Sequence, residues 1–453
     1  MSGSYVKRVT SRHRSGNLNN KSRRVPSGRL SRLAHFGGLA GKVASNVMIA
    51  GAKQALSGQK ASRSELLLQP GNIHAVAEKL SHLRGAAMKL GQLLSMDAGE
   101  LLPAELSVLL ERLRSDAAPM PHKQLVATLE KELGPDWLDK FSHIELNSFA
   151  RASIGQVHKA TSEQGLPLAI KVQYPGVADS IHSDVDNVVS LIKLSGLLPK
   201  TLNITPLVEE AKQQLLVETD YHQEAKALSA FEQALAHNPH FKVPKSYPAL
   251  SSKHLLTMEF VQGEPLEAMT SLPQAKRDQL AYRLIALFFT ELFELRMVQT
   301  DPNLANYQYN RDKDQIVLLD FGATRIISPS LCLGYKKLLQ AGAAQNRQKL
   351  KEAACEIGYF SDDIDPHYQN AVLSLFELAI SPLRASGPFD FASSGLAKQI
   401  SEQGRALSTQ SRQWHTPPVD AMFIHRKLAG LYLIASRLKA KVELSPLLNE
   451  IQV

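Results

Sequence analysis

The sequence predicts an α+β fold in two lobes. Strand-like runs gather in the middle of the chain, where IGQVHKA and LPLAIKV flank a glycine-containing turn, a pattern typical of a β-hairpin. Helical periodicity covers most of the remainder, and after Arg325 we expect helices throughout. With 453 residues, 44% of them hydrophobic and 21% charged, the chain has the composition of a soluble or peripheral protein and the length for two cores.

Positive charge is concentrated at the N-terminus. Residues 1–64 hold 13 Lys and Arg and no Asp or Glu, whereas the other 389 residues hold 39 basic and 43 acidic residues. We expect residues 1–24 to form a basic disordered arm that meets either solvent or an anionic membrane surface, and we expect no nucleic-acid partner. The two cysteines, Cys332 and Cys355, suit a reducing compartment and exclude a disulfide framework.

Residues 25–148 are expected to form an N-terminal helical extension. An amphipathic helix with small residues begins near Leu30, and it could pack on a membrane, on a partner helix or on the protein's own core. A second helix, HAVAEKLSHLRGAAMKLGQLLSM, has one apolar stripe, with Lys89 and Gln92 on the opposite side. Gly91 lies mid-helix, where it costs about 1 kcal/mol in helix stability relative to Ala. A close approach by another backbone would explain a glycine at this position. Taken alone, Lys89 and Gln92 fit a solvated polar face.

Residues 149–265 are expected to form a nucleotide-binding N-lobe. Lys171 ends the run LAIK, which is similar to the V-A-I-K strand whose lysine pairs with ATP phosphates and a helix glutamate. A lysine that is simply exposed at the end of a strand fits the same four residues. The segment ARASIG stands where a protein kinase has G-x-G-x-x-G. Its small residues still let the backbone approach phosphates, in a stiffer loop. The expected phosphate-loop contacts are Ala150, Ala152 and Ser153.

Two further segments complete this lobe. A helical tract over Pro206–Phe231 carries three acids, of which Glu218 and Asp220 lie about 200° apart and cannot face one point without a bend. Glu224 is therefore the better partner for Lys171. The segment LLTMEFVQGEPL then leaves the lobe as a hinge whose backbone would meet adenine, and the expected contacts are Glu259 and Val261.

The C-lobe, residues 266–453, contains the strongest chemical signal. Asp301 and Asn306 form a D-x-x-x-x-N pattern, and a buried strand further on ends in Asp320-Phe321-Gly322. In phosphoryl-transfer sites of the kinase type, these are the catalytic-loop acid, the metal-binding amide and the metal-binding acid. A lone Asp-Phe-Gly can be a plain turn, but both motifs in this order predict an ATP and Mg²⁺ site, because hard cations prefer carboxylate and amide oxygens.

Together, Lys89-x-Gly91-Gln92, ARASIGQVH, AIKVQYPG, Glu218-x-Asp220, QTDPN…N and LLDFGATR resemble the UbiB/AarF-domain (ABC1-type) atypical protein-kinase-like family, in its coenzyme-Q-supporting branch. The resemblance implies a bilobal protein-kinase-like fold with an added N-terminal helical domain and a largely helical C-lobe. It also implies Mg²⁺-dependent ATP binding and turnover that supports ubiquinone biosynthesis at a membrane. A family-specific gate would comprise Lys89, Gln92, Glu218 and Asp220. DPNLAN departs from the family's common DPHPGN but keeps the metal-binding Asn.

We therefore expect an atypical kinase or ATPase that uses ATP (or ADP) and Mg²⁺. The alternative is a nucleotide-binding pseudokinase scaffold that regulates a biosynthetic complex. A true protein kinase is disfavoured because the sequence has no A-P-E substrate platform. Expected partners are a nucleotide, an anionic membrane surface or lipid or quinone precursor, and a biosynthetic complex or second copy through the N-terminal helix. The expected location is the bacterial cytoplasm, peripheral at the inner membrane, or else the mitochondrial matrix.

Overall fold

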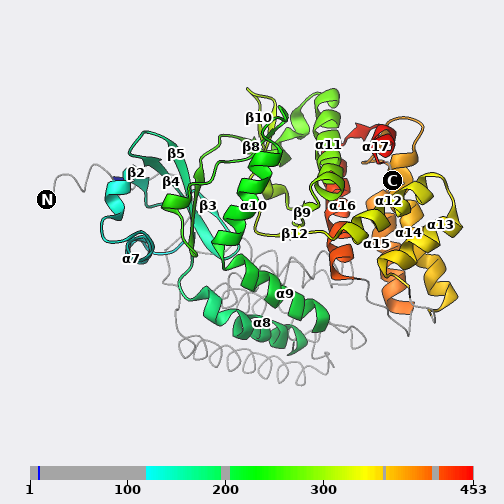
Figure 1. Ribbon diagram of the computed structural model, residues 1–453, viewed down its shortest axis with the longest axis horizontal. Helices are drawn as coiled ribbons and strands as arrows, with labels where there is room; N and C mark the ends of the chain where they lie inside the picture. Colours follow the sequence, from blue (N-terminus) through cyan, green and yellow to red (C-terminus); the bar gives the residue numbers. More distant parts are fainter. Residues whose placement is uncertain (1–8, 11–118, 195–204, 361–363, 411–417, 452–453) are drawn as a thin grey trace, which may run out of the picture. The chain divides into compact units, whose positions relative to one another are not determined.

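The computed structural model describes residues 9–10, 119–194, 205–360, 364–410 and 418–451 (Figure 1). Two compact units emerge from the contacts: Met1–Lys226 with Lys245–Phe260, and Ala227–Pro244 with Val261–Val453. The predicted gate residues Lys89 and Gln92 and the N-terminal amphipathic helix lie outside the described residues. No helix in the described ranges is long and apolar enough to cross a membrane.

A six-stranded sheet forms the centre of the first unit. Its order is β1-β2-β4-β5-β7, with β3 also paired to β4. All pairs are antiparallel except β1 with β2. The predicted hairpin is confirmed as β4 and β5, joined through Gly165 at φ +80°. The strands are β1 (Val9–Thr10), β2 (Phe141–Glu145), β3 (Ala150–Arg151), β4 (Gly155–Ser162), β5 (Pro167–Gln173) and β7 (Leu255–Glu259).

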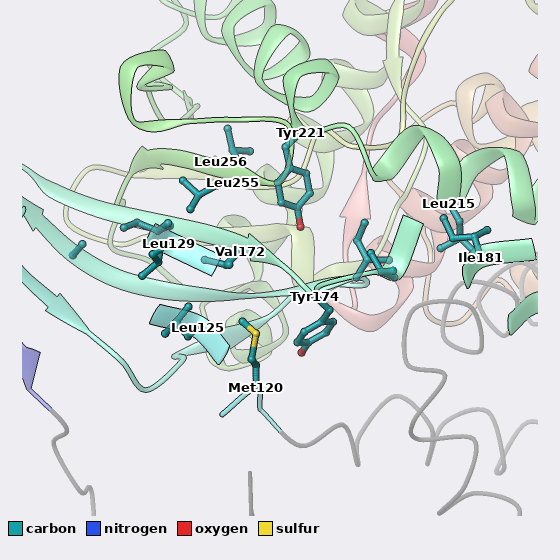
Figure 2. Packing of buried hydrophobic residues seen from close by; sticks show 14 of the residues in the cluster. Met120, Leu125, Leu129, Val172, Tyr174, Ile181, Leu215, Tyr221, Leu255 and Leu256 are labelled. Atoms are coloured by element: carbon teal, nitrogen blue, oxygen red, sulfur yellow. The ribbon is translucent and has the colours of Figure 1, made fainter. Parts of the chain in front are cut away.

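Helices and short turns accompany this sheet and share its core. One hydrophobic cluster joins residues of the segment before and within α7 to β5, β7, α8, α9 and the start of α10. Figure 2 shows part of it, with Met120 and Leu125 near Val172 and Tyr174 at the end of β5. The elements are α7 (His122–Leu133), η3 (Trp137–Lys140), α8 (Val177–Leu194), α9 (Thr205–Glu218), α10 (Tyr221–Ala234) and η4 (Pro248–Leu250).

Three local features differ from the sequence-based expectations. Val9–Thr10, within the arm expected to be disordered, pairs with β2. Strand β2 itself lies in the segment expected to be helical, and its antiparallel pairing with β4 makes it part of the central sheet. The expected helix over Pro206–Phe231 breaks after Glu218, because Asp220 Oδ1 accepts a hydrogen bond from His222 N and caps a new helix, α10.

The second unit is largely helical, as expected, and contains three small sheets. The four-stranded one has the order β6-β11-β10-β8, and the others are the pairs β9–β12 and β13–β14. Pairing of β10 with β11 forms the hairpin around Arg311–Asp314. The strands are β6 (Phe241–Lys242), β8 (Glu264–Pro265), β9 (Met297–Gln299), β10 (Tyr307–Asn310), β11 (Gln315–Leu318), β12 (Thr324–Ile326), β13 (Phe389–Asp390) and β14 (Lys441–Val442).

Helix α11 and its π-helical continuation η6 precede the β9 strand. The helical elements are η5 (Leu266–Ser271), α11 (Gln274–Phe289), η6 (Thr290–Glu294), η7 (Leu304–Asn306), α12 (Pro329–Ala343), α13 (Arg347–Ile357), α14 (Pro366–Arg384), α15 (Leu396–Gln410), α16 (Val419–Arg437) and α17 (Ser445–Glu450). Together they make the body that carries the catalytic-loop sequence.

The division between the units differs from the expected lobe boundary at residue 265. Residues 227–244 and 261–265 belong to the second unit. The reason is strand pairing: β6 adds to β11 in parallel, and β8 pairs with β10. Ile316 N also donates to His240 O at 2.8 Å, which ties the segment before β6 to the hairpin.

Candidate active site

Lys171 and Glu224 form a buried ion pair in the first unit. Lys171 lies on β5, opposite Leu256 of β7 and Val157 of β4, and Glu224 lies in the first turn of α10. Lys171 Nζ donates to both carboxylate oxygens of Glu224, at 2.7 and 2.8 Å. The two side chains are only 8% and 5% exposed. Burial strengthens the attraction between the two charges, but removing them from water costs free energy. Each side chain therefore needs the other to remain charged in this place.

The alanine-rich loop is held in place from two sides. Ala152 N donates to Gly155 O at 3.0 Å, which closes a tight turn between β3 and β4. Ser153 Oγ donates to Glu218 Oε2 at 2.7 Å. A Cβ at Gly155 would collide with Val172 O and lie 2.9 Å from the Tyr221 hydroxyl, so only glycine fits there. The structure thus brings together Ser153, predicted for phosphate binding, and Glu218, predicted for the gate.

The other predicted residues of this region occupy distinct positions. Asp220 caps α10 and does not share a helix face with Glu218. Glu259 ends β7, where its backbone N–H donates to Lys245 O at 2.8 Å and its carboxylate accepts from Lys245 N at 3.2 Å. Val261 is half-buried and begins the part of the second unit that follows β7.

The catalytic-loop sequence lies between β9 and β10 in the second unit. Asn306 Nδ2 donates to the backbone oxygen of Asp301 at 3.2 Å and to its Oδ2 at 3.4 Å, so the two predicted functional side chains meet. Thr300 anchors the start of the loop through two bonds to Ala323 O, from its backbone N at 3.0 Å and its hydroxyl at 2.7 Å. Asn303 Oδ1 accepts from Ala305 N and starts the short helix η7.

The Asp-Phe-Gly segment is fixed next to this loop. Leu319 N donates to Asn306 O at 3.1 Å, which brings the residue before Asp320 against Asn306. Asp320 Oδ1 accepts from Gly322 N at 2.9 Å, which sets the rotamer of its carboxylate. Phe321 is buried against Phe231 of α10, with ring centroids 4.8 Å apart. Asp301, Asn306 and Asp320 therefore belong to one local structure.

The donor set in the second unit fits Mg²⁺. Within the described ranges, no group of three or more His, Cys, Asp or Glu side chains is placed to hold a metal ion. Mg²⁺ in phosphoryl-transfer sites does not need such a cage, because one or two protein oxygens and the substrate phosphates supply its ligands. The amide oxygen of Asn306 and the carboxylate of Asp320 are ligands of this kind. The convergence of these groups with Lys171 on one nucleotide stays a prediction.

Comparison with known proteins identifies the family. The ABC1 atypical kinase-like domain matches residues 112–354, more than half of the chain. The chain belongs to this family. It is 36% identical over 424 residues to the mitochondrial atypical kinase COQ8B of Rattus norvegicus, covering 93% of this chain and 80% of that protein. It is 35% identical over 437 residues to the mitochondrial atypical kinase COQ8 of Saccharomyces cerevisiae, covering 95% and 86%.

This is the UbiB/ABC1 coenzyme-Q family that the sequence motifs resemble, so the resemblance is confirmed. A solved structure of Rv3197 from Mycobacterium tuberculosis in complex with erythromycin has the same fold, with a TM-score of 0.57 and 23% identity over 91% of this chain and 98% of that one. Our chain is thus a UbiB-type atypical kinase, as its family match and its relatives show. It has the expected α+β kinase-like fold.

The sequence motifs did not reveal the part that α16 plays near the catalytic loop. Gly430 of this helix packs against Pro302, the residue after Asp301, so closely that an added Cβ would lie 2.5 Å from Pro302 Cβ. Lys427, one turn earlier, is almost fully buried, in the run FIHRKLAGLYLI. A charged residue on the buried face of a helix was the signal that could have pointed to it.

Proposed function

We propose that this protein hydrolyses ATP, or transfers its γ-phosphoryl group, in an Mg²⁺-dependent reaction that supports coenzyme Q biosynthesis. The observation that carries the proposal is the buried bidentate pair of Lys171 and Glu224. A lysine held in this way is a fixed cation, and a fixed cation is what the phosphates of a nucleotide require. The local assembly of Asp301, Asn306 and Asp320 supports the same reaction.

Each residue has a defined role in this proposal. Lys171 orients the phosphates, while the loop with Ala150, Ala152 and Ser153 covers them. Asp301 accepts a proton from, or orients, the attacking hydroxyl or water. Bound Mg²⁺ would neutralise phosphate charge, and the residues that would hold it are Asn306 and Asp320.

The remaining predicted contacts complete the nucleotide site. The backbone of the Glu259–Val261 segment contacts adenine. Lys89, Gln92, Glu218 and Asp220 close the family-specific gate. The hydrogen bond from Ser153 to Glu218 supports a connection between that gate and the phosphate loop.

The proposed setting is a membrane surface. The acid-free stretch over residues 1–64 supports attraction to anionic lipid, and the relatives named above are mitochondrial proteins. We place the protein in the mitochondrial matrix, or in the bacterial cytoplasm at the inner membrane. A lipid or quinone precursor is the proposed acceptor class, and a biosynthetic complex or a second copy would bind through the N-terminal helix.

A phosphate-release assay tests the proposal. Release is measured with and without Mg²⁺, with and without vesicles containing anionic lipid, for wild type and Asp320→Asn. Asp312→Asn, which alters an exposed acid in the β10–β11 turn, is the matched control. We expect Mg²⁺-dependent release that Asp320→Asn lowers by a factor of about 100 or more and Asp312→Asn leaves unchanged. Turnover that survives Asp320→Asn rejects the enzyme assignment, and nucleotide binding without turnover in wild type favours the pseudokinase scaffold.

A further inference from the structure

A buried polar cluster lies where α16 meets the two strands that flank the catalytic loop. Lys427 of α16 and Glu291 of η6 have side chains that are 3% and 2% exposed, and Lys427 Nζ lies 3.7 Å from Glu291 Oε2. The same Nζ donates to the Tyr307 hydroxyl at 2.8 Å and to Gln299 Oε1 at 3.1 Å. The backbone N–H of Gln299 in turn donates to Glu291 Oε2 at 3.3 Å.

These contacts fall at the two ends of the catalytic loop. Gln299 is the last residue of β9, two positions before Asp301, and Tyr307 is the first residue of β10, directly after Asn306. A single ammonium group therefore holds both ends of the segment 300–306 together. Gly430, one turn further along α16, packs on Pro302 within that segment. Helix α16 thus contacts the start, the interior and the end of the loop region.

The electrostatics of the cluster extend to the catalytic acid. Burial lowers the pKa of Lys427, but the charges of Glu291 and Asp301 and the interaction with the Tyr307 hydroxyl together raise it above its ordinary value. The Asp301 carboxylate is thus one of the groups that favour the charged form of Lys427. Burial also raises the pKa of Glu291 to about 7, against the opposing effect of Lys427.

The cluster has an unusual backbone source. Glu291 lies in a π-helical turn that follows α11. Such turns are rare in proteins overall, and those that occur are often found at functional sites. A buried ion pair is weak evidence for stability, because apolar residues of similar volume often serve the fold equally well. A functional role therefore explains a buried lysine and glutamate beside the ends of the catalytic loop better than a contribution to stability does.

From this arrangement we propose that Lys427 is a positioning residue for phosphoryl transfer, which fixes both ends of the catalytic loop and so sets the place of Asp301 and Asn306. The inference rests on the proposed function. Lys427 contacts residues that flank the reacting groups, so its loss should lower kcat while nucleotide affinity, which depends on other residues, is kept.

The test compares four variants with wild type. Lys427→Met alone leaves the buried Glu291 carboxylate unpaired, so the double variant Lys427→Met/Glu291→Gln removes both charges and keeps the fold. Tyr307→Phe removes one acceptor of the ammonium. Tyr309→Phe is the matched control: it is also a buried tyrosine of β10, and its hydroxyl instead donates to Asp314 Oδ1 at 2.7 Å, in the distant hairpin turn. The readouts are the urea midpoint, the affinity for a fluorescent ADP analogue, and kcat and KM for ATP.

The double variant and Tyr307→Phe should bind the analogue within about twofold of wild type but lose about tenfold or more in kcat, since a displacement near 1 Å can cost 10²-fold. Tyr309→Phe should shift the urea midpoint and keep kcat. Wild-type kcat in the folded double variant overturns the positioning role, as does a kcat loss in Tyr309→Phe equal to that in Tyr307→Phe. Absence of turnover in wild type instead rejects the proposed function, and the inference falls with it.

Discussion

A single methyl group added at Gly430 should lower kcat strongly while it changes the free energy of unfolding only a little. An alanine Cβ there would lie 2.5 Å from Pro302 Cβ and closer still to its Cγ. Ordinary carbon contacts need about 3.5 Å, so α16 and the catalytic loop must move apart by roughly 1 Å. The proline ring cannot rotate away, because its backbone torsion is fixed by the ring. The displacement is therefore transmitted to the residue beside Asp301.

The expected stability change is small by comparison. Alanine in a helix interior is favoured over glycine by about 1 kcal/mol, whereas overpacking costs about 1–3 kcal/mol. Gly430→Ala should thus lower the free energy of unfolding by between 0 and about 2 kcal/mol. A 1 Å misplacement in an active site can cost about 10²-fold in rate, so kcat should fall far more than the folded fraction.

Urea unfolding and phosphate release measure the two effects in the same preparation. Gly342→Ala is the matched control, because its added Cβ would lie 2.4 Å from Cδ1 of Ile380, the end of a flexible side chain that can rotate, and no closer than 3.4 Å to another atom. We expect Gly342→Ala to keep kcat within about twofold. If Gly430→Ala folds and also keeps kcat within about twofold, α16 does not set the position of the loop, and the reasoning is refuted.

Two further predictions concern buried ionisable groups in the first unit. Lys171→Met or Glu224→Gln alone should cost about 3–5 kcal/mol in the free energy of unfolding, because each leaves a buried charge unpaired, and the double variant should recover most of it; urea unfolding of all three checks this. Burial lowers the pKa of His158 to about 4, below its value near 6.5 in the unfolded chain. Between those values the unfolded chain binds more protons, so stability falls with falling pH by about 3 kcal/mol in all, and unfolding of wild type and His158→Gln at pH 7 and pH 4 measures it.

The sequence was most informative where function depends on local spacing. Asp301 and Asn306 are five residues apart, and their side chains meet because one short loop closes between two strands. Choosing Glu224 over Glu218 as the partner of Lys171 needed only the helical period and the rule that a buried lysine requires a carboxylate. Chain positions 53 residues apart could be paired in this way, since the number of candidate acids was small.

Features that depend on tertiary pairing were not predictable. A strand near Phe241 is expected from the sequence, but nothing there indicates that the two-residue strand β6 pairs in parallel with β11. The hydrogen bond from Ser153 to Glu218 depends on the helix break at Thr219–Asp220, which a continuous helical pattern hides. Lys427 lies 120 residues beyond Tyr307, so no local motif connects them. In each case the decisive energy comes from a contact that the neighbouring residues do not specify.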